Sequence, residues 1–79
     1  MTSILIVEDD NDINNLICNT LKAEGYQCER AFDGKEGADK IEQNRYDLLL
    51  LDIGQIIDFL QSLKQAVGVF RYAQIPDVL

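Results

Sequence analysis

Two short runs of aliphatic residues each end abruptly in carboxylates. The first run, Ile4–Val7, is followed by Glu8 and Asp9, and the second, Leu48–Leu51, is followed by Asp52. Unbroken aliphatic runs of this length are typical of strands that are buried on both faces of a parallel sheet. If the two strands are parallel neighbours, all three carboxylates emerge at the carboxyl edge of the sheet, where open α/β sheets bind their ligands.

The three carboxylates predict a divalent metal site. Carboxylates that share one crevice repel one another, and a hard divalent cation relieves this repulsion. The alternative is that Glu8, Asp9 and Asp52 act separately, as helix caps or as solvated strand ends. Asp10 and Asp12, which follow the first run, are better explained as helix caps than as ligands.

Length and composition narrow the classes of function. The chain has 79 residues, which is enough for one domain, and its net charge of −7 argues against binding to nucleic acid, because phosphates are bound by basic surfaces. No apolar run could cross a bilayer and no signal peptide is evident, so we expect a cytoplasmic protein without a membrane partner. The chain lacks histidine, which excludes a zinc site of the usual kind, and Cys18 and Cys28 are expected to be small core residues.

The segments between and after the two runs alternate between helix and strand signals. Strands are predicted over residues 3–7, 26–31 and 47–51, and helices over 12–24, 35–43 and 55–66. The β-α-β-α-β order implies parallel strands that are joined by right-handed crossovers. The tail is open to two interpretations, a continued helix or a fourth strand that begins near residues 75–79.

Helical spacing predicts which faces of the helices are buried. The expected buried residues are Ile13, Leu16, Ile17 and Leu21 in the first helix, Ala38 and Ile41 in the second, and Ile56, Ile57, Leu60 and Leu63 in the third. Gly25 fits a left-handed C-terminal cap of the first helix.

These segments, taken together, resemble the receiver domain of two-component response regulators. The matching pieces are Ile4–Asp10, Gly25–Tyr26, Ala31–Glu36 and Tyr46–Ile53. The resemblance implies an α/β, flavodoxin-like fold, here truncated to a three-stranded parallel sheet of order 2-1-3 with flanking helices. We expect residues 1–79 to form a single domain, with a receiver-like part over 1–53 and a divergent helix and tail over 54–79.

The same resemblance assigns roles to individual residues. It implies that Asp52 accepts a phosphoryl group, and that Glu8 and Asp9, together with Asp52, hold Mg²⁺. Gly54 takes the place of the residue whose backbone carbonyl completes the metal site. The phosphoryl donor would be a phosphohistidine on a partner histidine kinase. Because the nucleophile lies on this chain, the protein would be at most a self-phosphorylating acceptor and not an enzyme in the usual sense.

The chain departs from the family pattern after Asp52. The Pro- and Gly-containing loop that usually follows the aspartate is shortened to Ile53–Gly54. The family's hydroxyl after strand four and lysine after strand five are not expected within these residues. We expect the far edge of the third strand to be unpaired, and to pair either with the chain's own tail or, preferably, with a second copy in a homodimer.

Two functions therefore stay open. The first is a Mg²⁺-dependent phosphoacceptor of two-component signalling. The second is a truncated or engineered half-receiver that acts as a self-associating structural unit without phosphotransfer. A nucleotide or flavin site is disfavoured, because no glycine-rich phosphate loop follows the first strand.

Overall fold

The computed structural model describes residues 1–63 and the backbone of 72–75. The elements are β1 (Ser3–Val7), α1 (Asn11–Ala23), β2 (Gln27–Ala31), α2 (Gly34–Gln43), β3 (Leu48–Asp52), a 3-10 turn (Ile53–Gln55), α3 (Ile56–Ser62) and β4 (Tyr72–Ile75). None of the helices in these described residues has the length and apolar character that crossing a membrane requires.

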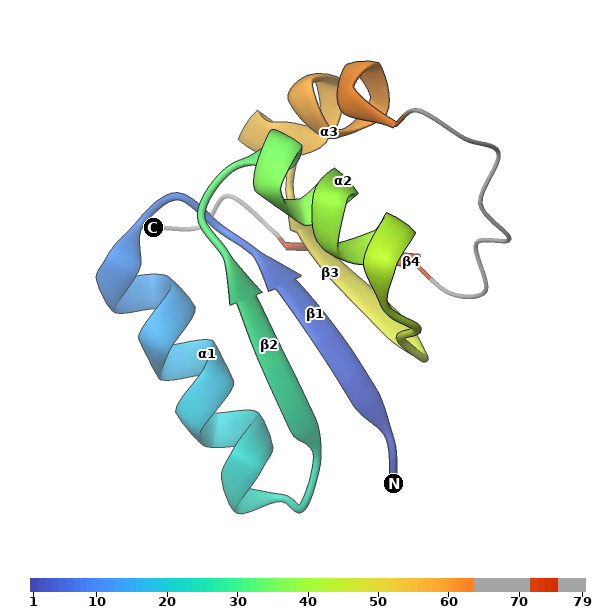
Figure 1. The fold of residues 1–79 in the computed structure, drawn as a ribbon. Coiled ribbons are helices and arrows are strands. Elements are labelled where there is room, and N and C mark those ends of the chain that lie inside the picture. The colour runs from blue at the N-terminus through green and yellow to red at the C-terminus, as the bar shows by residue number, and fades with distance from the viewer. Residues whose placement is uncertain (64–71, 76–79) are drawn as a thin grey trace.

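The strands form one parallel sheet in the order β2-β1-β3-β4. The predicted α/β fold with strands in the order 2-1-3 is confirmed, as is the position of β2 at an edge. Helix α1 covers one face of the sheet, and α2 and α3 lie together on the other (Figure 1). The arrangement is that of a doubly wound sheet, whose ligand crevice is at the carboxyl ends of the strands.

The far edge of the third strand pairs with the chain's own tail, the less preferred of the two partners expected for it. Strand β4 pairs in parallel with β3, in the register Leu49 to Tyr72 through Asp52 to Ile75. The backbone groups that would have served as a template for a second copy are therefore bonded within the chain. The homodimer through this edge loses its physical basis, and the alternative in which the tail supplies a fourth strand is the one observed. This strand begins three residues before the predicted one, and residues 76–79 lie outside the described part.

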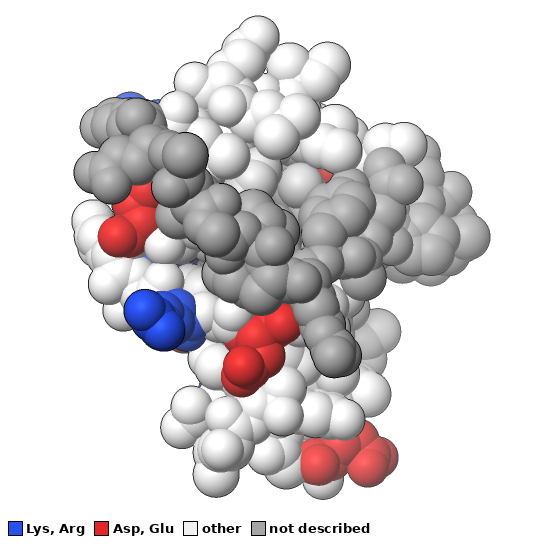
Figure 2. All heavy atoms as spheres, turned by 90° about the vertical axis from the view of Figure 1, so that its right-hand side faces the viewer, with Lys and Arg blue, Asp and Glu red and all other residues white. Residues whose placement is uncertain are grey.

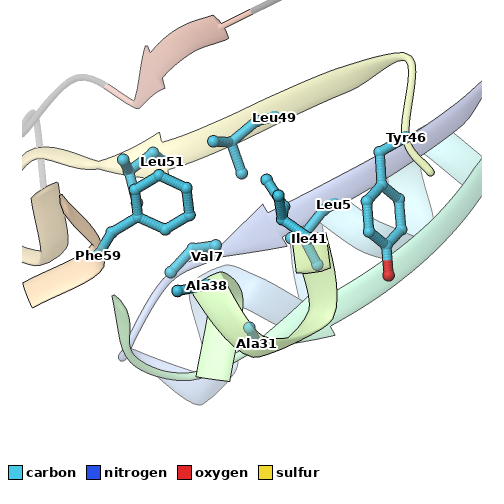
Figure 3. Close-up of a cluster of buried hydrophobic side chains, with 9 residues drawn as sticks. All are labelled: Leu5, Val7, Ala31, Ala38, Ile41, Tyr46, Leu49, Leu51 and Phe59. Carbon is cyan, nitrogen blue, oxygen red and sulfur yellow. The ribbon is translucent and has the colours of Figure 1, made fainter. Parts of the chain in front are cut away.

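The side chains of β1 and β3 point alternately to two separate cores. The larger core lies under α2 and α3, and its buried members are Leu5, Val7, Ala31, Ala38, Ile41, Tyr46, Leu49, Leu51 and Phe59 (Figure 3). The smaller core lies under α1 and contains Ile4, Ile6 and Cys18, with Leu48 and Leu50 packed against it and half-buried. Both thiols are free, and Cys28 joins Cys18 in the smaller core, as the sequence predicts.

The predicted buried faces of α1 and α3 are confirmed in part, since Ile17 and Leu21 are partly buried against the smaller core and Ile56 and Leu63 against the larger one. Leu16 is 65% exposed, and the residues of α1 that are buried are Asn14 and Cys18. In α3, Phe59 points into the core, whereas Ile57 and Leu60 are 67% and 58% exposed. In the view of Figure 2 the top of the molecule, over α3, shows mainly uncharged residues, although Asp58 of this helix is also exposed. In α2 the predicted inward residues, Ala38 and Ile41, are confirmed.

Local hydrogen bonds and one glycine define the ends of the elements. Asp10 caps α1 by accepting from the backbone N–H groups of Asp12 and Ile13, which confirms its prediction as a cap. Gly25, after the C-terminal end of α1, has a φ of 93°, in the left-handed region that favours glycine. Asp33 caps α2 by accepting from the N–H of Glu36, whose own carboxylate accepts from Phe32.

Candidate metal centre

The three predicted carboxylates lie together at the carboxyl edge of the sheet. Strands β1 and β3 pair in a register that places Val7 beside Leu51, so the next residues, Glu8 directly after β1 and Asp52 at the end of β3, come side by side. Asp9 continues the same turn. One carboxylate oxygen from each of Glu8, Asp9 and Asp52 lies within 4.8 Å of the others. The geometric expectation from the two aliphatic runs is met.

The three carboxylates differ in their surroundings. Glu8 is 5% exposed, and its Oε2 atom accepts a hydrogen bond of 3.1 Å from the backbone N–H of Asp10. Asp9 is exposed, and Asp52 is half-buried. The cluster is therefore closed on the side of Glu8 and open to solvent on the side of Asp9, which leaves a path for an ion and for a further ligand.

Burial and neighbouring negative charge raise the pKa of Glu8 from 4.5 to about 7. The largest cause is desolvation, since burial disfavours the charged form of a carboxyl group, while the hydrogen bond from Asp10 acts in the opposite direction. A side-chain hydrogen bond with Asp9 and the charges of Asp52 and Asp9 raise the pKa further. The site thus holds more negative charge than its own protein groups compensate.

Gly54 lies beside the carboxylate of Asp52. It is the central residue of the 3-10 turn that follows β3, and a β-carbon added to it would come within 3.3 Å of Oδ2 of Asp52. The turn bends the chain back immediately after the strand. Gly54 is thus next to a member of the cluster, and the role of its backbone carbonyl as a ligand stays a prediction.

The donor set fits a hard divalent cation. Mg²⁺ binds oxygen at about 2.0–2.1 Å, so two ligand oxygens on opposite sides of the ion are about 4 Å apart. The three carboxylate oxygens, which lie within 4.8 Å of one another, are close to this separation. The repulsion that raises the pKa of Glu8 is the repulsion that a cation would remove.

Sequence reasoning missed Asn14, which hydrogen-bonds to the backbone of Glu8 at this site. Asn14 of α1 is fully buried, and its side-chain Nδ2 donates to the backbone carbonyls of Glu8 and Ala31, each at 2.9 Å. The only available signal was its position four residues before the buried Cys18, on the same side of the helix.

Comparison with known families agrees with the fold and with the position of this cluster. The sequence matches the response regulator receiver domain family over residues 4–65. The chain belongs to this family. The match begins at residue 4 of the predicted receiver-like part over 1–53. It continues past the shortened loop and through α3.

Individual receivers show the same relationship. The chain is 45% identical over 69 residues to the uncharacterized transcriptional regulatory protein YcbL of Bacillus subtilis, covering 82% of this chain and 30% of YcbL. It is 45% identical over 53 residues to the response regulator ArlR of Staphylococcus saprophyticus, covering 67% of this chain and 24% of ArlR. The receiver described here therefore spans about a quarter to a third of the length of these relatives.

Solved structures of receivers superpose on the described fold. The response regulator TrrA of Thermotoga maritima, determined in complex with Mg²⁺-BeF, aligns with a TM-score of 0.66 at 40% identity, over 67% of this chain and 46% of TrrA. The chemotaxis response regulator CheY4 of Vibrio cholerae aligns with a TM-score of 0.72 at 29% identity, over 78% of this chain and 55% of CheY4.

Proposed function

We propose that this receiver accepts a phosphoryl group on Asp52 in a Mg²⁺-dependent reaction, with a histidine kinase as the donor. The observation that carries the proposal is the convergence of Glu8, Asp9 and Asp52 within 4.8 Å at the carboxyl edge of the sheet. An acidic cluster of this kind is suited to a hard cation, and its half-buried member, Asp52, is suited to nucleophilic attack.

Each residue of the cluster has a separate role in this proposal. Glu8 and Asp9 would hold the ion, Asp52 would contact it and act as the nucleophile, and the backbone carbonyl of Gly54 would complete the site. Bound Mg²⁺ would neutralise charge on the transferred phosphoryl group. An oxygen of Asp52 forms a bond to phosphorus, the phosphorus–nitrogen bond of the donor phosphohistidine breaks, and the electron pair stays on the imidazole. The product is an acyl phosphate on Asp52.

Two further observations support this proposal. The receiver TrrA, to which the chain is 40% identical, was determined with Mg²⁺-BeF. The alternative, a self-associating unit without phosphotransfer, depended on an open edge of β3, and β4 occupies that edge. The division of the chain into a receiver-like part over 1–53 and a divergent part over 54–79 stays a prediction.

Phosphorylation with a small donor tests the proposal directly. The chain is incubated with Mg²⁺ and acetyl phosphate, and its intact mass is measured. We expect a gain of one phosphoryl group that is absent in Asp52→Asn and absent when EDTA replaces Mg²⁺. Asp47→Asn is the matched control, because Asp47 is an exposed acid immediately before the same strand, and this variant is expected to be labelled like the wild type. Labelling that survives Asp52→Asn would refute the assignment of the acceptor.

A further inference from the structure

The buried Asn14 is hydrogen-bonded to the backbone of Glu8, where the chain turns from β1 into α1. Both polar atoms of its side chain have hydrogen-bond partners. Nδ2 carries two hydrogens and donates to two carbonyls, those of Glu8 and Ala31, at 2.9 Å each. Oδ1 accepts from Nε of Arg30, also at 2.9 Å. The orientation of the amide is fixed by this chemistry, because carbonyls accept only from the NH₂ group and a guanidinium donates only to the oxygen.

The side chain of Asn14 extends the backbone ladder at the point where β1 and β2 end. The last backbone hydrogen bond there runs from the N–H of Glu8 to the carbonyl of Ala31, at 3.1 Å. Beyond it the chain turns away into α1, and the Glu8 carbonyl is bonded by Asn14 instead. An amide side chain thus takes the place of the next rung of the sheet.

The hydrogen bond that orients the carbonyl of Glu8 also orients the backbone N–H and Cα of Asp9. The carbonyl of one residue and the N–H and Cα of the next lie in a single rigid peptide plane. This plane joins Glu8 to Asp9, the two residues whose carboxylates converge with that of Asp52. Rotation of the plane would change the direction in which the Asp9 side chain leaves the backbone.

Arg30 holds Asn14 in place from β2. Besides the bond to Asn14, its guanidinium donates to Oδ1 of Asn11 at 3.0 Å, and it lies over the ring of Phe32, with its central carbon 5.1 Å from the ring centre. The planar fork of arginine supports several such bonds in one orientation, which a lysine cannot do. Asn14 therefore holds the Glu8–Asp9 turn directly, and Arg30 holds it indirectly, through Asn14.

We propose that Asn14, clamped by Arg30, is a positioning residue that sets the Glu8–Asp9 peptide plane and thereby the geometry of the metal-binding carboxylates. The proposal rests on the proposed function, since it concerns the same site. Groups behind metal ligands commonly contribute in this way, and their loss typically weakens metal binding by about 10–100-fold.

The test compares Asn14→Leu, Arg30→Gln and a matched control, Asn19→Leu. The control makes the same substitution at an exposed asparagine of the same helix, away from Asn11 and Asn15, which both accept from Arg30. The first readout is the Mg²⁺ dissociation constant by isothermal titration calorimetry. We expect it to rise by about 10-fold or more in Asn14→Leu and by less in Arg30→Gln, with Asn19→Leu within about twofold of the wild type.

The second readout needs no metal. The residual dipolar coupling of the Asp9 N–H bond reports the orientation of the Glu8–Asp9 plane, and we expect it to change in Asn14→Leu and Arg30→Gln relative to couplings in β1. Should Asn14→Leu fail to fold, Arg30→Gln tests the same plane from a half-buried position. Unchanged couplings and an unchanged dissociation constant in folded variants would overturn the proposal. A wild type that binds no Mg²⁺, with couplings that change as expected, would refute the proposed function and leave the positioning role standing.

Discussion

The backbone N–H of Lys35 donates to Oδ2 of Asp58 across 2.9 Å, although the two residues are 23 positions apart in the chain. A second bond runs beside it, from the N–H of Gly34 to Oε1 of Gln55, at 3.2 Å. The first turn of α2 is thus capped partly by side chains from the segment that follows β3. These bonds hold α3 against α2 and so fix the start of the segment that leads away from Asp52.

Removing this cap is expected to destabilise the fold modestly. Asp58→Ala leaves the Lys35 N–H without its acceptor, and a lost cap of this kind costs about 0.5–2 kcal/mol of unfolding free energy. Asp58→Asn retains an acceptor oxygen and is the matched control, with a smaller loss. Urea denaturation followed by circular dichroism measures both. Equal stability of the wild type and Asp58→Ala would contradict the role of this bond.

Gly34 is expected to tolerate no side chain. A β-carbon at this position would collide with the backbone of α3 and of the turn before it, at the nitrogen of Phe59 and the carbonyl of Gln55. Gly34→Ala therefore has to push α3 away from α2, and such overpacking costs about 1–3 kcal/mol or more. Lys35→Ala, at the next position and exposed, is expected to change the unfolding free energy by less than about 0.5 kcal/mol. Similar denaturation midpoints for the two variants would disprove the close helix contact.

The inward face of α3 has a direct test. Phe59 is 3% exposed in the larger core, and Phe59→Ala is expected to cost about 3–5 kcal/mol, enough to unfold much of a chain this short. Ile57→Gln, two positions earlier and on the exposed side, is expected to be nearly neutral. If Ile57→Gln were the more damaging change in thermal denaturation, the helix would be facing the other way.

The metal-free protein is expected to lose stability as the pH rises through neutrality. The pKa of Glu8 is raised from 4.5 to about 7, so between these values the folded state binds more protons than the unfolded state. This contribution is fully present below pH 4.5 and is lost as the pH rises through about 7. Mg²⁺ favours the ionised form, so the stabilisation that it supplies grows over the same interval.

Urea denaturation at a series of pH values, with EDTA and then with Mg²⁺, measures this dependence. In Glu8→Gln the metal-free slope between pH 4.5 and about 7 should become flatter, because the group with the raised pKa is gone. A slope that is identical in the variant and the wild type would show that other groups produce it.

Much of the fold and of the candidate site could be predicted, because both depend on the strongest signals in the chain. Aliphatic runs such as Ile4–Val7 and Leu48–Leu51 are buried on two faces, and parallel pairing then brings the residues after them to one edge. The neighbouring positions of Glu8 and Asp52 could be predicted from this arrangement alone. Predicting the acidic cluster therefore required no knowledge of the helices.

The helix faces were harder because apolar residues lie on more than one side of α1 and α3. Spacing placed Leu16 inside, yet the fully buried residue is Asn14, whose amide is compensated by three hydrogen bonds. Hydropathy counts an asparagine as polar and cannot anticipate that backbone carbonyls and Arg30 will satisfy it. In α3 the fully buried residue is Phe59, and of the predicted residues Ile56 and Leu63 are partly buried against the same core, whereas Ile57 and Leu60 are exposed.

The pairing of β4 could not be predicted for a different reason. Residues 54–79 carry no continuous aliphatic run like those of β1 and β3, and Pro76 permitted a strand start as well as an edge. The exposed-edge argument identified correctly that β3 needs a partner on its far side. It preferred a second copy as that partner, and this preference was wrong, because the tail of the same chain can make the same backbone hydrogen bonds.

The central claim is that Glu8, Asp9 and Asp52 hold one divalent ion together. The most direct test is a Mg²⁺ titration by isothermal titration calorimetry of the wild type, Asp9→Asn and Asp12→Asn. Asp12 is an exposed acid in the first turn of α1, so its replacement removes the same charge near the site without removing a member of the cluster. We expect the dissociation constant to rise by about 10-fold or more in Asp9→Asn, because a ligand is lost. It should change by less than about threefold in Asp12→Asn, because that variant loses only a more distant charge, whose attraction for the ion is screened by salt. Equal weakening in the two variants, or no binding by the wild type at millimolar Mg²⁺, would contradict the claim.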